Sequence, residues 1–559
     1  MRRLALQLDR ELARRLAFGF TLFLLAFETY VVGADNSKDL VELFASASGP
    51  YLLTALIFAV ATSYLVFRFC YEALSSRWPL RAAYLILLAI SLVIEYSYQK
   101  ALGRFSQVMD IELATATTME QKIVSITMYF GYSAVIPIVV LTALLIFTRG
   151  IDGRGLRHFF AINGMIILVL ATSSVLSVAR FPAISTIAFY RTNVEFLLEG
   201  PFAQGEWGSD LTGITQRRQP ITSPELAAGY EPDNNIIFVV DESVRGDHFS
   251  LNGYQRPTTP LLDDLQRRGF LHNWGIAAAA STGSHTSYNI IVTGLTPDDF
   301  PDTGHRKLKG TPTIFQYAKA MGYKTWFFDG QMDFFWGGIN DDRRSIDNWY
   351  GVDQIRDSQS VEERDIDLVI ARRINKIISD SKGNFIFVFK HGSHVPYHHN
   401  FPPDQAVWQP SYVNENRFNI PGRDELDAVA NAYDNSIRYN TNLFFGNLID
   451  DYSRIPNNTV IVYTGDHGQT LFVNGKASHS GHTRAEATVP LFVIGKLPVE
   501  VDTNYKPSHN NLYPTILDLM NYPMEARERN LPLSLLKAKA SDSRQRFFNP
   551  SYGAKMPFD

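Results

Sequence analysis

Two apolar, β-branched segments of this chain stop abruptly at polar residues that can bind a metal. The run NNIIFVVDES delivers Asp241, Glu242 and Ser243, and the run VIVYTGDHGQT delivers Asp466 and His467. Taken singly, such residues are often helix N-caps or loop residues. In an open α/β sheet, however, ligands bind beyond the carboxyl ends of the strands. Because Glu, Asp and His all bind divalent cations, the two strand ends together predict one metal site built from distant parts of the chain.

A cluster of hydroxyl groups lies in the segment IAAAASTGSHTSYNIIVTG, where a run of small residues passes into an apolar helix. The hydroxyl residues are Ser281, Thr282, Ser284, Thr286 and Ser287. One interpretation is a helix with an ordinary N-cap, since Ser and Thr are preferred there. The other is a nucleophile at a helix N-terminus, where backbone N–H groups and the helix dipole favour an anionic phosphoryl group. A nearby metal would help such a hydroxyl to ionise at neutral pH.

Most of the remaining candidate residues are histidines. The segment FKHGSHVPYHHNFPP follows another apolar strand, and NGKASHSGHTR begins a few residues beyond His467. Their candidate residues are Lys390, His391, His394, His398, His399, His479 and His482. A single histidine after a strand is usually a packed residue, but four within nine residues favour at least one functional member. These segments are expected to converge on one edge of the sheet.

Alternating strand and helix patterns predict the elements that hold these residues in place. Strands are expected at 235–241, 323–329, 384–390, 458–464 and 489–494, and helices at 258–268, 312–321, 361–380, 424–452 and 511–520. This alternation is typical of an α/β domain with a mainly parallel sheet covered on both faces.

The first 185 residues have a different composition. They hold five long apolar segments, at roughly 14–34, 50–74, 80–101, 123–148 and 158–182. Each is long enough to cross a bilayer, which takes about 20 apolar residues. Buried core helices of a soluble protein are the alternative, but five such segments in succession with short polar loops favour a transmembrane domain. The net charge of -4 gives no reason to expect a nucleic-acid partner. The single cysteine, Cys70, predicts no disulfide.

The placement of Lys and Arg predicts the orientation in the membrane. Basic residues gather before the first span and in the second and fourth loops, at Arg2, Arg3, Arg10, Arg14, Arg15, Arg77, Arg81, Arg149, Arg154 and Arg157. Cytoplasmic loops carry such an excess, so the N-terminus is expected in the cytoplasm and the soluble domain outside. We therefore expect a five-helix transmembrane domain at 1–185, a linker at 186–232 with a surface helix near 191–199, and an outer catalytic domain at 233–559.

Five motifs of the chain together resemble the sulfatase-like branch of the alkaline phosphatase superfamily. Within it, the chain is most similar to the membrane phosphoethanolamine transferases that decorate lipid A and related glycans. The motifs are FVVDESVRGDHFSLNGYQRPTTPLL, STGSHTS, KHGSHVPYHHNFPP, AYDNSIRYN and TGDHGQTLFVNGKASH. Five membrane spans ahead of the catalytic domain also match that family, so the resemblance covers nearly the whole chain.

The resemblance implies a role for each matching residue. Glu242, Ser284, Asp466 and His467 match the metal ligands, and Ser284 stands at the position of the nucleophile. His394 and His479 match residues that bind the phosphate or the headgroup and assist proton transfer. In that family the metal is zinc, and in the related lipoteichoic acid synthases it is manganese, so Zn²⁺ is expected, with Mn²⁺ as the alternative.

Further substrate-binding residues are expected around this set. His482 and Lys390 lie in the same motifs. Thr115 and Glu120 lie in the third loop of the membrane domain, where relatives use a Thr and a Glu, and Glu120 would face the ammonium group of the donor lipid. Sulfatase activity is not expected, because Ser284-His285-Thr286 lacks the Pro that formylglycine formation requires.

The expected function is transfer of phosphoethanolamine from phosphatidylethanolamine to an envelope glycan such as lipid A or the lipopolysaccharide core. It would proceed through a phospho-enzyme on Ser284, in the bacterial inner membrane with a periplasmic catalytic domain. Three features depart from the family. Ser284 and the flanking Thr282 stand where relatives have Thr and Cys, the outer domain has no cysteines whereas many relatives have disulfides there, and FDGQMDFFWGGINDDRR resembles lipoteichoic acid synthases. A glycerol-phosphate transferase and a membrane phosphodiesterase therefore remain alternatives. A non-catalytic sensor or scaffold would have been free to lose the Glu/Ser/Asp/His set.

Overall fold

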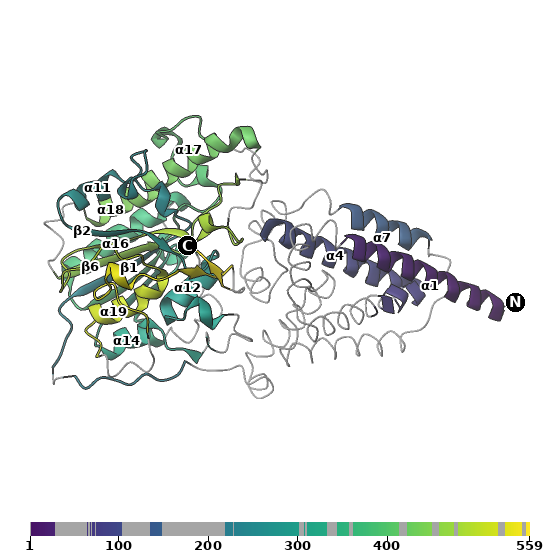
Figure 1. Ribbon diagram of the computed structural model, residues 1–559, viewed down its shortest axis with the longest axis horizontal. Coiled ribbons are helices and arrows are strands. Elements are labelled where there is room, and N and C mark those ends of the chain that lie inside the picture. Colours follow the sequence, from purple (N-terminus) through teal and green to yellow (C-terminus); the bar gives the residue numbers. More distant parts are fainter. Residues whose placement is uncertain are drawn as a thin grey trace. The chain divides into compact units, whose positions relative to one another are not determined.

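The computed structural model divides the chain into two compact units, Met1–Thr215 and Gln216–Asp559 (Figure 1). It describes residues 2–27, most of 64–102, 135–147 and 218–559, with gaps at 227–228, 301–306, 308–309, 332–343, 357–360, 413–421, 450–457, 474–478, 524–530 and 551–554.

The first unit contains helix α1 (Arg2–Phe27), whose first half is charged, and the apolar helices α4 (Trp78–Leu102) and α7 (Val135–Phe147). Helix α4 buries Leu85 and Leu88 yet leaves Ile86 and Ile90 exposed, and a helix that is apolar on all sides suits a lipid environment. Within the described residues, one stretch, Trp78–Glu95, is long and apolar enough to cross a bilayer.

The five expected spans are covered unequally by these helices. The segment 80–101 lies within α4, 14–34 and 123–148 are covered in part by α1 and α7, 50–74 is described only in part, and 158–182 lies outside the described residues. The number of crossings therefore stays a prediction.

The second unit is built on a seven-stranded sheet in the order β2-β7-β6-β1-β5-β3-β4. Five neighbouring strands run parallel: β1 (Asn235–Asp241), β3 (Lys324–Asp329), β4 (Asn348–Tyr350), β5 (Asn384–Phe389) and β6 (Thr459–Gly465). Strand β7 (Thr488–Ile494) runs antiparallel to both β6 and β2 (Leu271–Ala278). The expected mainly parallel sheet is thus a mixed one.

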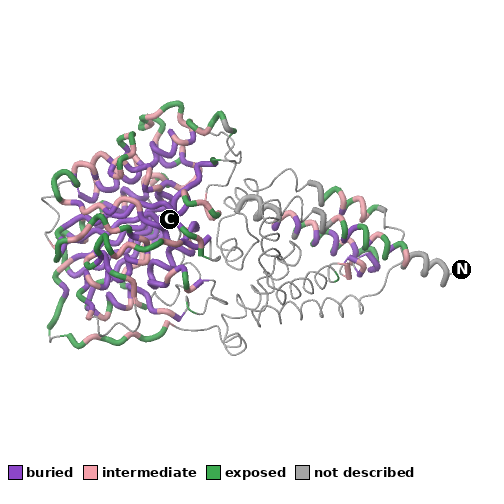
Figure 2. Tube along the Cα trace, in the orientation of Figure 1, coloured by how far each residue is buried: buried purple, intermediate pink, exposed green. Residues whose placement is uncertain are grey.

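Helices cover both faces of this sheet. In Figure 1, α12 (Ser284–Thr293), α14 (Ile314–Ala320) and α19 (Leu512–Leu519) lie on one side, and α11 (Pro260–Arg267), α17 (Leu426–Ile437) and α18 (Leu443–Leu448) on the other. Helix α16 (Ile366–Asp380) packs against α18. The central strands β1, β5 and β6 are buried along their length (Figure 2). Burial on both faces explains why these strands appear in the sequence as continuous apolar runs.

All five predicted strands are confirmed, but β2 and β4 were not anticipated. Strand β2 is a mixed sequence, LHNWGIAA, in which Gly275 has a positive φ and the register shifts between Asn273 and Gly275. A bulge of this kind breaks the alternation of polar and apolar residues by which a strand is recognised.

The helix expected at 424–452 is divided into three parts. Helix α17 passes into a π-helical segment, Arg438–Asn442, before α18 begins. Thr441 of this segment donates to Oδ2 of Asp241 over 3.0 Å, and Asn440 donates to the Gly392 carbonyl over 2.8 Å. The widened turn therefore supports two of the strand ends that carry candidate site residues.

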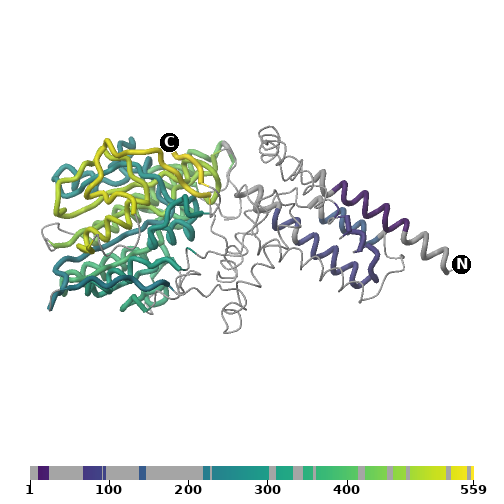
Figure 3. Tube along the Cα trace, turned by 60° about the horizontal axis from the view of Figure 1, so that its bottom comes forward, coloured from purple at the N-terminus to yellow at the C-terminus, as the bar shows by residue number. Residues whose placement is uncertain are grey.

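Both ends of the second unit make backbone contacts with other parts of that unit. Gln219 donates its backbone N–H to the Gly310 carbonyl over 2.9 Å, and the compact unit is counted from Gln216. The domain bounds expected at 185, 232 and 233 stay predictions. Near the other end, Ser508 and Asn549 form bridges with Ala278 and Ser281, and Figure 3 shows this late segment, in yellow, beside earlier teal ones. The surface helix expected near 191–199 lies outside the described residues.

Candidate active site

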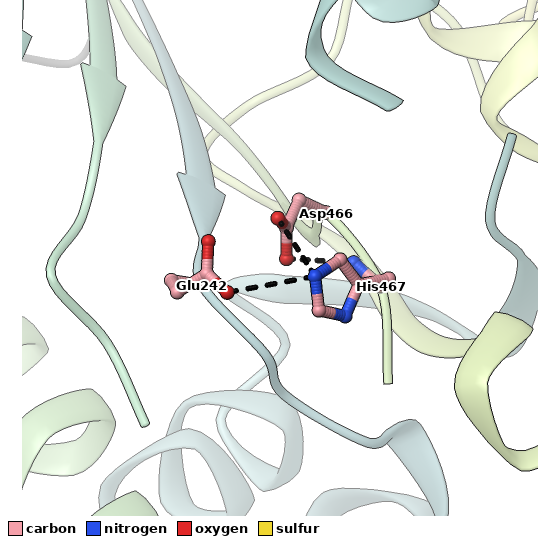
Figure 4. A group of neighbouring side chains, drawn as sticks. All are labelled: Glu242, Asp466 and His467. Atoms are coloured by element: carbon pink, nitrogen blue, oxygen red, sulfur yellow. Dashed lines mark hydrogen bonds and ion pairs between the residues drawn. The ribbon is translucent and has the colours of Figure 1, made fainter. Parts of the chain in front are cut away.

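The carboxyl ends of β1 and β6 bring three possible metal ligands together. Asp241 and Gly465 are paired in the parallel register, so the residues that follow them meet at one edge of the sheet. Ligand atoms of Glu242, Asp466 and His467 lie within 4.8 Å of one another, and all three side chains are buried (Figure 4). The sequence predicted this juxtaposition from the two strand ends.

The two carboxylate oxygens of Asp466 differ in their surroundings. Oδ1 accepts the N–H groups of Ser243 and His467 over 2.9 and 2.7 Å. Oδ2 is buried and accepts no hydrogen bond from the residues that the structure describes. Burial and the neighbouring Glu242 carboxylate raise the pKa of Asp466 well above its usual value. A cation between the two carboxylates would satisfy Oδ2 and offset their repulsion, so these residues fit a divalent metal.

The ring of His467 is held in the tautomer that a metal requires. Its Nδ1 donates to the Gly468 carbonyl over 2.8 Å, which leaves Nε2 unprotonated. Nε2 lies 3.5 Å from both Oε1 of Glu242 and Oδ2 of Asp466, as the dashed lines in Figure 4 mark. Burial lowers the pKa of His467, which favours the neutral ring.

Glu242 is oriented by two neighbours. The Ser243 hydroxyl donates to Oε1, and Nε2 of Gln331 donates to Oε2 over 2.8 Å. Gln331 follows β3 at the same edge of the sheet, and we did not predict it. The rule that found Glu242, a polar residue just after a buried strand, would have found Gln331 as well.

Ser284 is the first residue of α12 and faces the same cluster. Its Oγ lies 3.0 Å from Nε2 of His467, and Gly283 precedes it in an extended conformation. Because Nε2 carries no proton, the hydroxyl is the donor in this contact. The hydroxyl thus stands at the start of a ten-residue helix, where backbone N–H groups favour an anion.

Two of the predicted histidines lie against this centre. The ring of His479 stacks on that of His467 with centroids 4.6 Å apart, and His394 lies 5.2 Å from His479. Burial, together with the His467 and His394 rings, lowers the pKa of His479 well below its usual value. His394 donates from Nδ1 to the Val395 carbonyl over 2.7 Å, so its Nε2 is the nitrogen able to accept a proton.

The other expected substrate-binding residues are placed differently. His482 is exposed, three residues beyond His479. Lys390 is completely buried, and its Nζ lies 2.5 Å from Oδ2 of Asp241 and 3.7 Å from Oδ2 of Asp367. This geometry contradicts the expected contact between Lys390 and substrate: its charge neutralises the carboxylate beneath Glu242. Thr115 and Glu120 lie outside the described residues.

The turn that presents Glu242 is supported by Tyr433, whose motif carried part of the family resemblance. Ser243 has a left-handed backbone with φ of 63°. The Tyr433 hydroxyl accepts the N–H of Arg245 over 2.8 Å and donates to the Ser243 carbonyl over 2.7 Å. Gly392 approaches from β5, and a Cβ there would lie 2.5 Å from the Glu242 carbonyl oxygen. Both contacts restrict where the Glu242 side chain can point.

About half of the chain is similar in sequence to a known family and to characterised proteins. A family profile described as Sulfatase matches residues 234–522, just over half of the chain. The phosphoethanolamine transferase EptC of Escherichia coli is 27% identical over 307 residues, which are 51% of this chain and 50% of that protein. The Kdo(2)-lipid A phosphoethanolamine 7''-transferase of Escherichia coli is 22% identical over 314 residues, 52% of each chain. The chain thus matches about half the length of these curated relatives.

Two solved structures share the fold. The C-terminal periplasmic domain of EptC from Escherichia coli, in complex with Zn, aligns with a TM-score of 0.50 at 23% identity and covers 61% of this chain and 97% of that one. The integral membrane protein lipooligosaccharide phosphoethanolamine transferase A of Neisseria meningitidis aligns with a TM-score of 0.56 at 15% identity, over 90% of this chain and 95% of that one.

Proposed function

Because this chain belongs to the sulfatase family, we propose that it transfers phosphoethanolamine from phosphatidylethanolamine to an envelope glycan such as lipid A or the lipopolysaccharide core. One observation carries the proposal: the Ser284 hydroxyl lies 3.0 Å from His467 Nε2, within a buried cluster that fits a divalent cation. The names of the relatives, which are phosphoethanolamine transferases, support the choice of transferred group.

The proposed metal ligands are Glu242, Asp466, His467 and Ser284, with Zn²⁺ as the expected ion and Mn²⁺ as the alternative. The bound ion would supply positive charge that favours ionisation of Ser284 and offsets charge on the phosphoryl oxygens. The N-terminus of α12 adds backbone N–H groups on the side of the nucleophile.

The reaction has two halves. Ser284 Oγ forms a bond to phosphorus, the bond from phosphorus to the diacylglycerol oxygen breaks, and diacylglycerol leaves with the proton. The acceptor hydroxyl then attacks the same phosphorus, the bond from phosphorus to Ser284 Oγ breaks, and the proton lost by the acceptor is returned to the Ser284 oxygen. His479, with its lowered pKa, and His394, through Nε2, are the residues placed to move these protons.

The membrane unit is proposed to keep the active site near its lipid donor. We propose five crossings, with the N-terminus in the cytoplasm and the catalytic unit in the periplasm of a bacterial inner membrane. The basic residues of the predicted cytoplasmic loops support this orientation. The relatives described as a periplasmic domain and as an integral membrane protein agree with it. The third loop, with Thr115 and Glu120, is proposed to bind the ammonium headgroup.

The test uses the full-length protein in detergent with zinc and labelled lipid vesicles. Phosphatidylethanolamine should yield diacylglycerol, a phosphoethanolamine adduct on the peptide containing Ser284, and modified lipid A when that acceptor is added. Diacylglycerol from phosphatidylglycerol alone would instead indicate glycerol-phosphate transfer. Free phosphoethanolamine that accumulates equally with and without an acceptor would indicate a phosphodiesterase. Either result would overturn the proposal.

A further inference from the structure

His509 is a buried histidine that has no part in the chemistry proposed above. It opens the short 3-10 turn His509–Asn511 ahead of α19 and is 1% exposed. Its ring makes polar contacts with Ala280, Ser287 and Thr464, which belong to the nucleophile segment and to the strand that ends at the metal ligands. A buried imidazole in this position joins the two halves of the site.

The contacts of the ring determine where its proton lies. The backbone N–H of Ala280 can only donate, and it points at Nδ1 over 3.0 Å, so Nδ1 carries a lone pair. Nε2 therefore holds the proton and donates to Oγ1 of Thr464 over 3.1 Å. The Thr464 hydroxyl in turn donates a hydrogen bond to the Pro490 carbonyl over 3.0 Å. Burial lowers the pKa of His509 to about 3, in keeping with a neutral ring of fixed tautomer.

The residues that His509 joins lie close in sequence to the reacting groups. Ala280 is four residues before Ser284, and Thr464 is two residues before Asp466. Ser287, one helical turn after Ser284, lies 3.3 Å from Nδ1 and donates to the Asp466 carbonyl over 2.6 Å. The loop before the nucleophile, the first turn of α12 and the end of β6 are thus connected at one point beneath the site.

The backbone of His509 is itself well anchored. Ser508 forms a bridge with Ala278 at the end of β2, and its N–H donates to Oδ1 of Asn511 over 2.9 Å. Thr515, one turn into α19, donates to the Asn511 carbonyl over 2.6 Å and accepts the N–H of Leu535. The imidazole therefore projects from a fixed turn, as a positioning group must.

We propose that His509 is a positioning residue that sets the separation between the Ser284 hydroxyl and the metal-binding end of β6. This inference rests on the proposed function, in which that separation decides how readily Ser284 attacks phosphorus. A misplacement of about 1 Å in a reacting group can lower the rate on the order of a hundredfold. His509 touches neither reacting atoms nor metal ligand atoms, so its loss should act on kcat rather than on KM.

The experiment compares four variants of the full-length protein. H509L removes both hydrogen-bonding nitrogens, and H509Q keeps one acceptor and one donor. T464V removes the acceptor of the Nε2 proton together with the donor to the Pro490 carbonyl. T325V, the matched control, removes an equally buried threonine hydroxyl from the amino end of β3, at the opposite end of the sheet from the site.

Two readouts are taken: hydrogen exchange of the peptide spanning 279–287, and the kcat and KM of diacylglycerol release. H509L and T464V should speed exchange at that peptide about tenfold or more and lower kcat about tenfold to a hundredfold with KM unchanged. H509Q should recover part of both. T325V should match the wild type in both, whatever it does to thermal stability.

The outcomes separate this inference from the proposed function. If the wild type releases no diacylglycerol, the proposed function fails, and exchange at 279–287 alone decides whether His509 holds the nucleophile segment. Wild-type exchange and wild-type kcat in both H509L and T464V would overturn the inference. An equal fall of kcat in T325V would overturn it too, because general destabilisation would then explain the loss. If H509L does not fold, T464V, which retains the imidazole, gives the deciding result.

Discussion

Gln331 donates a hydrogen bond from Nε2 to Oε2 of Glu242 over 2.8 Å, although the two residues are 89 positions apart in the chain. The same amide nitrogen donates to the Lys390 carbonyl over 3.0 Å, so the ends of β3, β1 and β5 meet at this side chain. One oxygen of Glu242 is thus held by Gln331, while the other faces Nε2 of His467. Supports of this kind orient metal ligands.

Replacing Gln331 by Ala should weaken metal binding without unfolding the protein. Loss of such a support typically lowers metal affinity about 10- to 100-fold. Zinc titration against a competing chelator measures the change. Q354A is the matched control, since the Gln354 side chain accepts the Gly351 N–H from helix α15 (Val352–Arg356), away from the site. Unchanged affinity in the Gln331 variant would remove this residue from the metal centre.

Replacing Ser284 by Ala should abolish transfer and leave the fold intact. The change removes the proposed nucleophile, so the rate should fall on the order of a thousandfold or more. Diacylglycerol release and peptide mass spectrometry provide the measurements, and S284T is expected to keep activity because it retains the hydroxyl. An adduct found on Thr282 or Thr286 would contradict the assignment.

Replacing Asp466 by Asn, or Glu242 by Gln, should lower both bound metal and activity. Asp466 Oδ2 is buried without a hydrogen-bond donor, so the amide substitution removes a negative charge where the cation is expected. Elemental analysis of the purified variants measures occupancy, and chelation of the wild type should reproduce the loss of activity. D298N, at an exposed carboxylate, is the control. Full occupancy in both variants would count against these ligands.

Replacing Tyr433 by Phe should destabilise the catalytic unit. The change leaves the Arg245 N–H and the Ser243 carbonyl without their buried partner, at a cost of about 1–3 kcal/mol. Chemical denaturation followed by fluorescence measures the free energy of unfolding. Y513F should cost less, because the hydrogen bond from the Tyr513 hydroxyl to the Pro312 carbonyl is long, at 3.4 Å. Equal losses would show that the Ser243 turn has no special need of Tyr433.

A reporter fused after Asp559 should be active only if it functions outside the cytoplasm. The expectation follows from the Lys/Arg distribution together with five crossings. An enzyme that requires export, compared with one that requires the cytoplasm, provides the measurement. A cytoplasmic signal would overturn both the orientation and the envelope substrate.

The site residues that could be predicted are those that directly follow an apolar strand in the sequence. An apolar run that ends at Glu242, or at Asp466 and His467, carries its own signal, because parallel strands place their carboxyl ends at one edge. Strands β1, β5 and β6 of the parallel core were predictable for the same reason, since burial on both faces leaves continuous apolar runs. The short, half-buried parallel strand β4 has no such run. Strand β2, broken by a bulge at Gly275, had no such pattern.

The amino-acid sequence alone determined which residue types stand at the strand ends, and therefore that metal-assisted chemistry was to be expected. Which neighbours support them was decided by the tertiary structure. Lys390 follows an apolar strand within a candidate site motif, which suggested a substrate-binding residue, yet its side chain is buried against Asp241. Gln331 and His509 reach the site only because strand order and the turn before α19 bring distant segments together. A sequence pattern reports which face a residue occupies, but the partner of a buried polar group depends on the packing of segments far apart in the chain.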